Sequence, residues 1–339
     1  MKKIKIGSVG LGRLGYEHAK NIASLIPEAE LLALCDVAED NLKKVAAELA
    51  VPNTYTDFEE MCKNPDLDAI VIVSPSAFHP EQIRIALENG KHVFSEKPLG
   101  VNVEECKKAE AAVEAHPDQK FMLGFMRRFD PSYINAKQRI ERGDIGRIIM
   151  IRGYSVDPRS TIKGTIAFGP HSGGQFLDMA VHDIDLIRWF SGSEPDRLWA
   201  IGGCYEFEEF ASWNDGDNVS CTMQLKDDTM AFLFAGRAAP HGSHVETEII
   251  GTKGSIRISA IPTPDLVQLY DEHGVRQECY QDFMNRWHQA YINEISEFCR
   301  CIMEDRTPPI GVYDGTECTR IAYRCKESFE NGGQLLSMD

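Results

Sequence analysis

Asp178 and His182 are four residues apart in the stretch GGQFLDMAVHDIDLIRWF, which spans residues 173–190. An α-helix over this stretch places both side chains on one narrow polar stripe between two apolar flanks. Burying a carboxylate and an imidazole without partners would cost several kcal/mol. The pair could therefore move a proton at a buried site, or it could be a hydrogen-bonded pair that only orients the helix.

A metal site is a third possibility, because Asp183 and Asp185 lie close to His182 in the sequence. Asp183, however, points about 100° away from His182 on the helical wheel, and no further His or Cys spacing supports metal binding. The ten cysteines are scattered, with Cys299 and Cys301 as the only close pair and no CxxC. We predict no metal and reduced thiols.

The second group of residues that could bind a ligand is a glycine-rich turn, Gly10-Leu11-Gly12-Arg13-Leu14-Gly15. It leaves an expected strand and opens an expected helix, which is the context that dinucleotide binding requires. Gly10 would permit the tight turn, Gly12 would let a pyrophosphate approach the backbone, and Gly15 would let helix and strand pack closely. The N–H groups of the helix N-terminus favour the phosphates. The alternative is a helix-capping turn with no ligand.

Asp36 ends the next expected strand, about 20 residues after the turn, where a ribose-binding acid belongs. Its carboxylate can accept hydrogen bonds from the hydroxyl groups of the adenosine ribose. The 2′-phosphate of NADP would meet this charge and those of Glu39 and Asp40. The pattern predicts NAD as the cofactor, with a mere helix-capping role for Asp36 as the alternative.

The elements that position these residues alternate between strand and helix through the first third of the chain. The expected strands, apolar on both faces, are residues 3–9, 31–36, 68–74, 91–97 and 120–125. The expected helices are residues 13–26, 39–50, 79–90 and 103–116. This alternation is typical of a parallel sheet covered by helices. We therefore expect an α/β fold that begins with a Rossmann domain over residues 1–124.

Beyond residue 125 the pattern changes from alternation to strands in succession. Helices are expected over 132–143 and 173–190, with a strand over 146–157 between them. Further strands are expected at 217–225, 229–236, 244–251, 254–259 and 266–272, before helices near 284–304 and 314–330. Short turns between the strands indicate hairpins. We predict a second α/β domain over 125–339 with a large, mostly antiparallel open sheet.

The strand TMAFLFAG, residues 229–236, is apolar on both of its alternating faces. Helices of the same domain can cover one face of the sheet, but the second face then needs another partner. We expect a homo-oligomer, specifically a homotetramer, in which sheets of different subunits pack together.

Composition excludes several classes of protein. The 339-residue chain has a net charge of −16, which disfavours a general nucleic-acid binder. It has no run of 18 apolar residues, so we expect no membrane span. The start, MKKIKIGSVGLG, runs into the glycine turn without the apolar core of a signal peptide. We expect a cytoplasmic protein whose partners are small molecules and other copies of itself.

Four motifs together resemble the glucose–fructose oxidoreductase/inositol dehydrogenase family. They are the turn at 10–15, SEKPLG (95–100), GFMRRFDPSY (124–133) and GGQFLDMAVHDIDLIRW (173–189). The last two most resemble inositol 2-dehydrogenases. The resemblance implies a bound nicotinamide cofactor and a polyol or sugar substrate held between a Rossmann domain and a second domain with a large open sheet.

The resemblance also implies roles for individual residues. It places Lys97, Asp178 and His182 around the reacting hydroxyl group, and Arg127 near the site. It places four further residues along the cofactor, namely Ser74, Pro75, His79 and Glu96. Without the resemblance, Lys97 could be a solvated surface lysine, and His79 could simply cap or pack against its helix.

One stretch departs from the family pattern. Inositol dehydrogenases of this type often carry His-Arg-Asn-like residues after the first strand of the second domain, whereas this chain has Ser155-Val156-Asp157-Pro158. The departure assigns Asp157 to the substrate contacts and leaves the specific substrate open.

These observations predict an NAD-dependent dehydrogenase that oxidises a secondary ring hydroxyl of a cyclic polyol, most simply myo-inositol at C2. His182 would take the proton, Asp178 would orient it or bind a neighbouring hydroxyl, and Lys97 would stabilise charge on the reacting oxygen. One rival is a dehydrogenase of a sugar or glycoside, for example at C3. A rival of another class is an NAD-binding sensor without turnover.

Overall fold

The computed structural model describes residues 3–258 and 263–338, and the chain divides into two compact units. Unit 1 comprises Met1–Phe129 and Gln289–Thr319, and unit 2 comprises Asp130–His288 and Arg320–Asp339. Ser259, the last residue of the strand expected at 254–259, lies outside the described residues. None of the helices in the described ranges is both long and apolar enough to cross a membrane.

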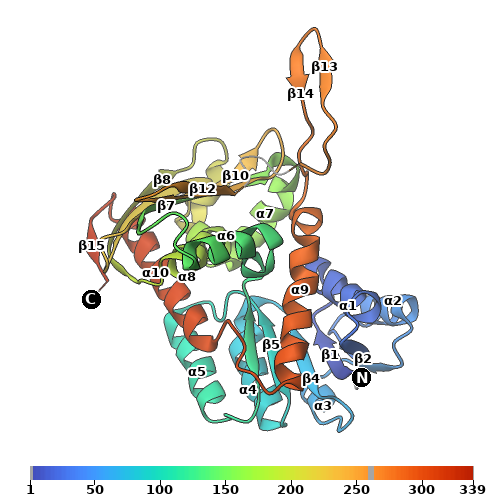
Figure 1. Cartoon of the computed structure of the whole chain (residues 1–339). Coiled ribbons are helices and arrows are strands. Elements are labelled where there is room, and N and C mark those ends of the chain that lie inside the picture. Colours follow the sequence, from blue (N-terminus) through green and yellow to red (C-terminus); the bar gives the residue numbers. More distant parts are fainter. Residues whose placement is uncertain (1–2, 259–262, 339) are drawn as a thin grey trace. The chain divides into compact units, whose positions relative to one another are not determined.

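Unit 1 is built on a six-stranded parallel sheet with the strand order β3-β2-β1-β4-β5-β6 (Figure 1). Its strands are β1 (Ile4–Val9), β2 (Ala29–Cys35), β3 (Asn53–Tyr55), β4 (Ala69–Ile72), β5 (His92–Glu96) and β6 (Phe121–Gly124). Its helices include α1 (Arg13–Ser24), α2 (Glu39–Leu49), α3 (Phe58–Cys62), α4 (His79–Glu88) and α5 (Val103–Glu114). Nearly every side chain of β1, β4 and β5 is buried, as expected where helices cover a parallel sheet. The predicted Rossmann architecture is confirmed.

Residues 289–319, far along the chain, also pack into unit 1. The backbone N–H of Leu123 donates to the Ile310 carbonyl at 3.2 Å, which ties this segment to the end of β6. The rings of Phe94 and Phe298 lie 6.0 Å apart. Residues 289–319 belong to α9 (Phe283–Met303), to α10 (Val312–Glu330) and to the loop between these two helices. The core of unit 1 is therefore assembled from two separate parts of the sequence.

Unit 2 is built on a seven-stranded mixed sheet with the order β12-β11-β7-β10-β9-β8-β15. Its strands are β7 (Ile148–Pro158), β8 (Pro195–Gly203), β9 (Asn218–Leu225), β10 (Met230–Ala239), β11 (His244–Gly251), β12 (Ser255–Ile258) and β15 (Leu336–Ser337). Strands β7 and β10 are parallel, and every other neighbouring pair is antiparallel. The predicted α/β fold with a large, mostly antiparallel second sheet is confirmed.

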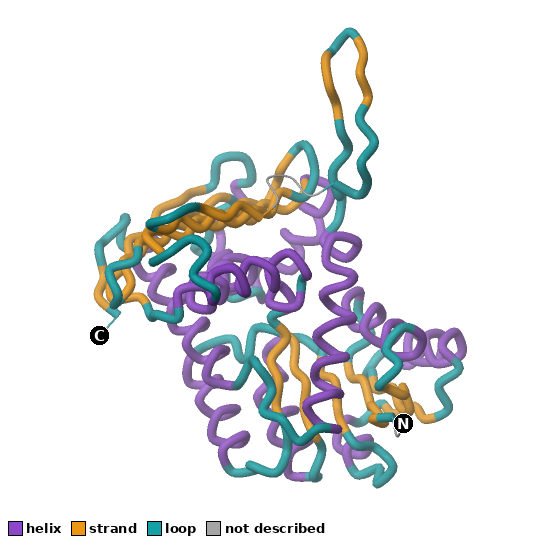
Figure 2. The backbone as a smooth tube through the Cα atoms, viewed as in Figure 1, coloured by secondary structure: helices purple, strands orange, loops and turns teal. Residues whose placement is uncertain are grey.

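The two faces of this sheet differ sharply at β10. Ala231 and Leu233 are at most 1% exposed and belong to the core, whereas Met230 on the other face is 48% exposed. In Figure 2 the helices of unit 2 lie mainly along one side of its seven-stranded sheet. One apolar face of β10 is therefore part of the core, and the other apolar face lies at the surface of the unit.

The helix expected over 173–190 is shorter and less regular than its sequence pattern suggests. Gly173 and Gly174 have φ of +78° and +91°, so the helix cannot include them. A π-helical segment, Phe176–Ala180, comes first, and the α-helix α8, Val181–Ser191, follows. A wheel drawn at 100° per residue therefore misplaces the side chains of the first turn relative to those of α8.

Several elements of the structure lack a clear signal in the sequence. In unit 1 these are β3 and α3, and in unit 2 they include β8, β15, α7 (Ile162–Phe168) and one partner of a small hairpin. That hairpin pairs β13 (Leu269–Asp271) with β14 (Gly274–Arg276), and all six residues are exposed. The remaining helix of unit 2, α6 (Pro131–Glu141), agrees with the expected helix at 132–143.

Candidate active site

The glycine turn of unit 1 has the geometry that the sequence predicts for a dinucleotide fingerprint. Gly10 has φ of +84°, and a Cβ there would come within 2.6 Å of the Ser74 backbone nitrogen. A Cβ on Gly15 would lie 1.8 Å from the Gly10 carbonyl oxygen, so only glycine permits this packing. A Cβ on Gly12 would meet nothing within 4 Å. The space beside Gly12 suits a pyrophosphate at the N-terminus of α1, where Arg13 and Leu14 are the first helical residues.

Asp36 lies at the carboxyl end of β2 and is tied to this turn. Its Oδ2 accepts a hydrogen bond from the Leu11 N–H at 2.6 Å, and its Oδ1 accepts one from the Ala38 N–H at 2.8 Å. Each carboxylate oxygen has a second lone pair, so Asp36 can still accept ribose hydroxyl groups. The structure brings Asp36 and the glycine turn together.

Ser74 and Pro75 follow the carboxyl end of β4, the strand next to β1 in the sheet. The Ser74 hydroxyl donates to Gln82 Oε1 at 2.5 Å, which links this loop to helix α4. Since Gly10 packs against the Ser74 backbone, the loop after β4 and the glycine turn form one edge of the unit 1 sheet. This is the edge at which parallel α/β sheets bind their ligands.

His79 is buried beneath this loop and uses both ring nitrogens within the protein. Its Nδ1 lies 2.8 Å from the Pro98 carbonyl oxygen, and its Nε2 lies 2.8 Å from the Ser74 carbonyl oxygen. Burial lowers the pKa of His79, although both carbonyl oxygens oppose that shift. His79 therefore joins the loop after β4 to the loop after β5, which makes it a support for the proposed cofactor residues.

Glu96 is the last residue of β5, and Lys97 follows it directly. Glu96 is 4% exposed, its Oε1 lies 2.8 Å from His18 Nε2, and its Oε2 accepts the backbone N–H of Lys97 at 3.1 Å. Lys97 itself is half-buried. Glu96 therefore fixes the backbone that carries Lys97. Arg127, also proposed for the site, is buried in the 3₁₀ turn Met126–Phe129 after β6.

His18, Glu96 and Glu294 form a buried cluster in unit 1 that sequence reasoning did not find. Their possible ligand atoms lie within 4.8 Å of one another, close enough for one metal ion. Burial and the nearby charge of Glu96 raise the pKa of Glu294 well above its usual value. A neutral Glu294 leaves one negative charge, on Glu96, already in contact with His18. The hydrogen bonds of the cluster join His18 to Glu96 and Glu96 to the Lys97 backbone, whereas neither carboxyl oxygen of Glu294 has a hydrogen-bond partner. We interpret the His18–Glu96 pair as a support for the Glu96–Lys97 backbone.

Asp178 and His182 lie within unit 2 on the irregular helix described above. Between Gly174 and Arg188, Asp178 is the one side chain that is not buried, and His182 is 8% exposed. Asp157, half-buried, is near the end of β7. Asp183 is buried and faces the sheet, since Ser155 donates to its Oδ2 at 2.5 Å and Gly153 packs against it. The accessible polar position of this buried helix is therefore Asp178.

Arg237 is a residue of this region that sequence reasoning missed. It is 2% exposed near the end of β10, and its Nη1 donates to Asp178 Oδ2 at 2.7 Å. A signal was present in the sequence, because a single arginine interrupts the small apolar run FAGRAAP at the end of a strand. The ion pair shows that unit 2 supplies Asp178 with a charged partner from its own sheet.

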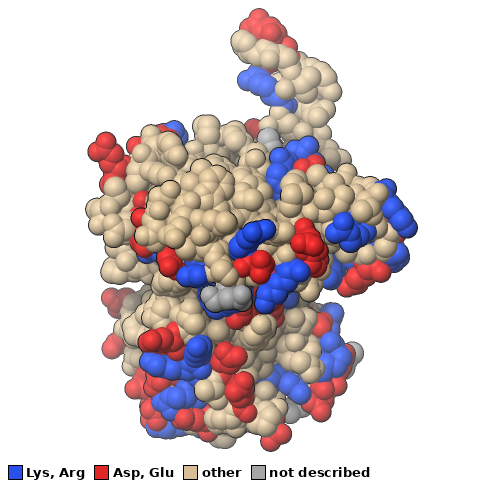
Figure 3. Space-filling view, turned by 90° about the vertical axis from the view of Figure 1, so that its left-hand side faces the viewer, with Lys and Arg blue, Asp and Glu red and all other residues tan. Residues whose placement is uncertain are grey.

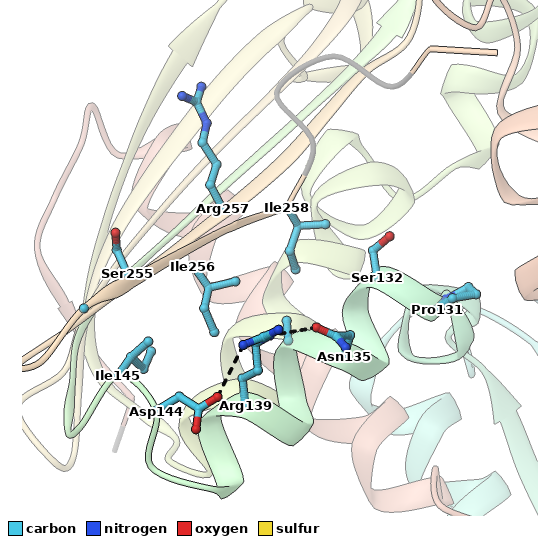
Figure 4. Close-up of a pocket in the computed structure, with 12 residues that line it drawn as sticks. Pro131, Ser132, Asn135, Arg139, Asp144, Ile145, Ser255, Ile256, Arg257 and Ile258 are labelled. Carbon is cyan, nitrogen blue, oxygen red and sulfur yellow. Dashed lines mark hydrogen bonds and ion pairs between the residues drawn. The ribbon is translucent and has the colours of Figure 1, made fainter. Parts of the chain in front are cut away.

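A groove of about 780 Å³ on unit 2 is distinct from these residues. It lies between α6 and the edge strand β12, and Figure 4 shows Arg139 beside Asn135 and Asp144 at its base. Its lining includes none of the residues predicted for the cofactor or the substrate. We do not assign the active site to it.

Comparisons with known proteins agree with this arrangement of units. Residues 4–125 match a family model described as "Oxidoreductase family, NAD-binding Rossmann fold", and residues 133–257 match the "GFO/IDH/MocA C-terminal domain". The chain is 34% identical to scyllo-inositol 2-dehydrogenase (NAD(+)) of Bacillus subtilis, over 97% of this chain and 95% of that protein.

Two solved structures extend the likeness to the whole fold. Scyllo-inositol dehydrogenase of Lactobacillus casei, with bound NAD(H) and scyllo-inositol, is 44% identical with a TM-score of 0.96 and 99% coverage of both chains. Myo-inositol 2-dehydrogenase of Lactobacillus plantarum is 36% identical with a TM-score of 0.96 and complete coverage of both chains. Since the two family models together match most of the chain and these relatives align over nearly its whole length, the chain belongs to the GFO/IDH/MocA family of oxidoreductases.

Proposed function

We propose that this protein is an NAD-dependent inositol dehydrogenase and that scyllo-inositol is its preferred substrate. The observation that carries the proposal is the 44% identity, over 99% of the chain, to a protein crystallised with NAD(H) and scyllo-inositol. The myo-inositol 2-dehydrogenase structure is 36% identical over the same length. Sequence motifs alone favoured myo-inositol, and the higher identity to the scyllo-inositol enzyme shifts the proposal.

The residues of unit 1 fit NAD. The open space beside Gly12 and the N–H groups at the start of α1 would receive the pyrophosphate, and Asp36 would accept the ribose hydroxyl groups. Ser74, Pro75 and Glu96 would line the cofactor at the same sheet edge, with His79 holding two of these loops together. NAD, when bound, accepts the hydride that the alcohol carbon loses.

Five side chains are proposed to contact the substrate. His182 would take the hydroxyl proton as the alcohol carbon becomes a ketone, a task that suits an imidazole near neutral pH. Lys97 would donate a hydrogen bond to the reacting oxygen and stabilise its developing charge. Asp178 would accept a hydrogen bond from a neighbouring hydroxyl group. Arg127 and Asp157 would bind further hydroxyl groups, and their charges suit a polyol that is rich in donors and acceptors.

The decisive experiment is a substrate screen that follows the absorbance of the reduced cofactor. The purified protein is mixed with NAD and with scyllo-inositol, myo-inositol, D-chiro-inositol, glucose or an alkyl glucoside. We expect the highest kcat/KM with scyllo-inositol, measurable turnover of myo-inositol and little activity on the sugars.

Other outcomes of the screen identify the rival functions. Preference for glucose or the glucoside would make the protein a sugar or glycoside dehydrogenase. NADH binding without turnover of any compound would favour a sensor. Preference for myo-inositol would keep the reaction and overturn the proposed substrate.

A further inference from the structure

Arg237 is a buried cation near the end of β10 that forms an ion pair with Asp178. Its side chain is 2% exposed, and its Nη1 donates to Asp178 Oδ2 at 2.7 Å. Its guanidinium carbon lies 5.9 Å from the centre of the Phe210 ring, which adds a contact between the cation and an aromatic face. The guanidinium is therefore held between a ring and a carboxylate.

Packing alone does not account for a charge at this position. Taking a guanidinium out of water costs several kcal/mol, and apolar side chains of similar volume often stabilise a fold as well or better. Burial works to lower the pKa of Arg237, but the carboxylates of Asp178, Asp157 and Asp215 outweigh it and raise that pKa above its usual value. Arg237 is the common counter-charge of three acids, two of which are proposed to bind substrate.

The segment that carries Asp178 is fixed from two sides. The Asp215 carboxylate accepts the backbone N–H of Gln175 with both oxygens, each at 3.0 Å, at the start of the irregular helix. Arg237 holds Asp178 itself three residues later. Asp178 belongs to the π-helical segment Phe176–Ala180, and such segments often occur at functional sites.

We propose that Arg237 is a positioning residue for substrate recognition: its hydrogen bond holds the Asp178 carboxylate in one orientation, ready to accept a hydrogen bond from a polyol hydroxyl group. The Asp178 side chain is 22% exposed while Arg237 is covered. Arg237 thus acts from behind Asp178 and does not itself contact the substrate. The inference rests on the proposed function, because it takes Asp178 to be a substrate-binding residue.

The exposure of Asp178 also makes the inference testable. When Arg237 is shortened, the carboxylate that remains can be hydrated, so we expect Arg237→Ala to fold. Arg237→Lys keeps the charge but lacks the planar fork of the guanidinium, and it serves as a second variant. Arg188 is the matched control, because it makes a similarly buried ion pair in unit 2, to Glu194 at 2.7 Å, away from Asp178.

The experiment measures kcat and KM for scyllo-inositol at saturating NAD, and the Kd for NADH by its fluorescence. We expect Arg237→Ala to lose about 10²-fold in kcat/KM, while the Kd for NADH changes by less than about twofold. Arg237→Lys should recover part of that loss. Arg188→Ala should be nearly as active as the wild type. Added guanidinium ion should raise the activity of Arg237→Ala and should not change the activity of Arg188→Ala.

A double-mutant cycle with Asp178→Asn separates positioning from general stability. If Arg237 acts through Asp178, adding Arg237→Ala to Asp178→Asn should reduce kcat/KM by less than about threefold. The inference is overturned if Arg237→Ala is as active as Arg188→Ala, or if its effect is undiminished in the Asp178→Asn background. A wild-type protein that turns over no inositol would instead contradict the proposed function.

Discussion

The Asp36 carboxylate accepts a hydrogen bond from the backbone N–H of Leu11, at 2.6 Å, across the carboxyl ends of β1 and β2. The contact joins the acid that would hold the adenosine ribose to the turn that would hold the pyrophosphate. If the ribose binds at Asp36 as proposed, the carboxylate would also face the 2′-phosphate of NADP. We therefore propose that Asp36, whose position is set by the fold, selects between the two cofactors.

The first prediction concerns that choice. We expect the wild type to prefer NAD over NADP by at least about tenfold in kcat/KM, which corresponds to about 1.4 kcal/mol. Asp36→Ser should reduce this ratio, because it removes the repulsion and a ribose acceptor together. The measurement is kcat/KM for both cofactors, with Asp66→Ser, a change of an exposed acid elsewhere in unit 1, as the control. An unchanged ratio in Asp36→Ser would remove Asp36 from this role.

The second prediction concerns the proposed proton acceptor and the proposed oxygen ligand. His182→Ala and Lys97→Ala should each lower kcat by about 10²-fold or more, because each removes a group that acts on the reacting hydroxyl. NADH binding, measured by fluorescence, should survive both changes.

Exposed residues of the same types provide the matched controls for this test. Lys107→Ala and His273→Ala change exposed side chains, and both should leave kcat nearly unchanged. Near-normal turnover in both His182→Ala and Lys97→Ala would show that the assignment of these roles is wrong.

Much of unit 1 could be predicted because its signals are local. Strand β4 is a continuous apolar run, the glycine turn at 10–15 follows β1, and Asn102 caps the N-terminus of α5. The strand β3, Asn53–Tyr55, has only three residues and is defined by its pairing with β2, so the sequence contains little sign of it. Strand β8 begins with Pro195, Asp196 and Arg197, which are not typical strand residues, and its register is defined by its pairing with β9. Long-range pairing of this kind has no local sequence signal.

In the candidate site, too, the sequence predicts contacts between residues that are near in the chain and misses contacts between residues that are distant. The fingerprint glycines and Asp36 are about 20 residues apart within one supersecondary unit, so spacing alone predicts their proximity. Arg237 and Asp178 are 59 residues apart, and only the folded sheet brings them together. A helical wheel also cannot predict the π-helical turn at Phe176–Ala180, because the wheel assumes one fixed rotation per residue.

The third prediction concerns the outer face of the unit 2 sheet. Strand pairing aligns Trp199, Thr222 and Phe232 in one row, and Ile201, Ser220 and Phe234 in the next. Trp199, Ile201 and Met230 on this face are 42–48% exposed. Figure 3 shows a broad area without charged side chains below the projecting hairpin. The row of Phe232 continues into the ion pair of Arg152 and Glu248, so the apolar part of this face lies over β8, β9 and β10. Exposed apolar side chains gathered there favour burial against a second copy of the chain.

We therefore expect a homo-oligomer, specifically a homotetramer. Light scattering should give a mass of about four times 38.0 kDa at micromolar concentration. Phe232→Glu should lower that mass by placing a charge in the contact, whereas Glu30→Gln, an exposed change on unit 1, should not. A monodisperse 38.0 kDa species for the wild type would contradict the expectation.

The last prediction concerns Glu294, whose side chain is fully buried beside Glu96 and His18. Burial and the Glu96 charge raise the pKa of Glu294 well above its usual value, so the folded state binds a proton that the unfolded chain releases above about pH 4.3. The contribution of Glu294 to the free energy of unfolding is therefore full below about pH 4.3 and is lost as the pH rises toward the pKa of Glu294 in the folded state. A glutamine at this position has no such proton to lose.

Glu294→Gln should therefore gain stability relative to the wild type as pH rises, because its neutral amide resembles the protonated acid in shape and charge. We expect the difference in Tm between variant and wild type to grow by about 2 °C or more between pH 5.5 and pH 8. Glu96→Gln is the informative contrast, since it removes the charge that contacts His18 at 2.8 Å, and it should lower Tm at both pH values. A Tm difference for Glu294→Gln that is constant across this range would mean that Glu294 is ionised in the folded protein. The His18–Glu96–Glu294 cluster would then hold two negative charges, and a bound cation would become the better explanation of its structure.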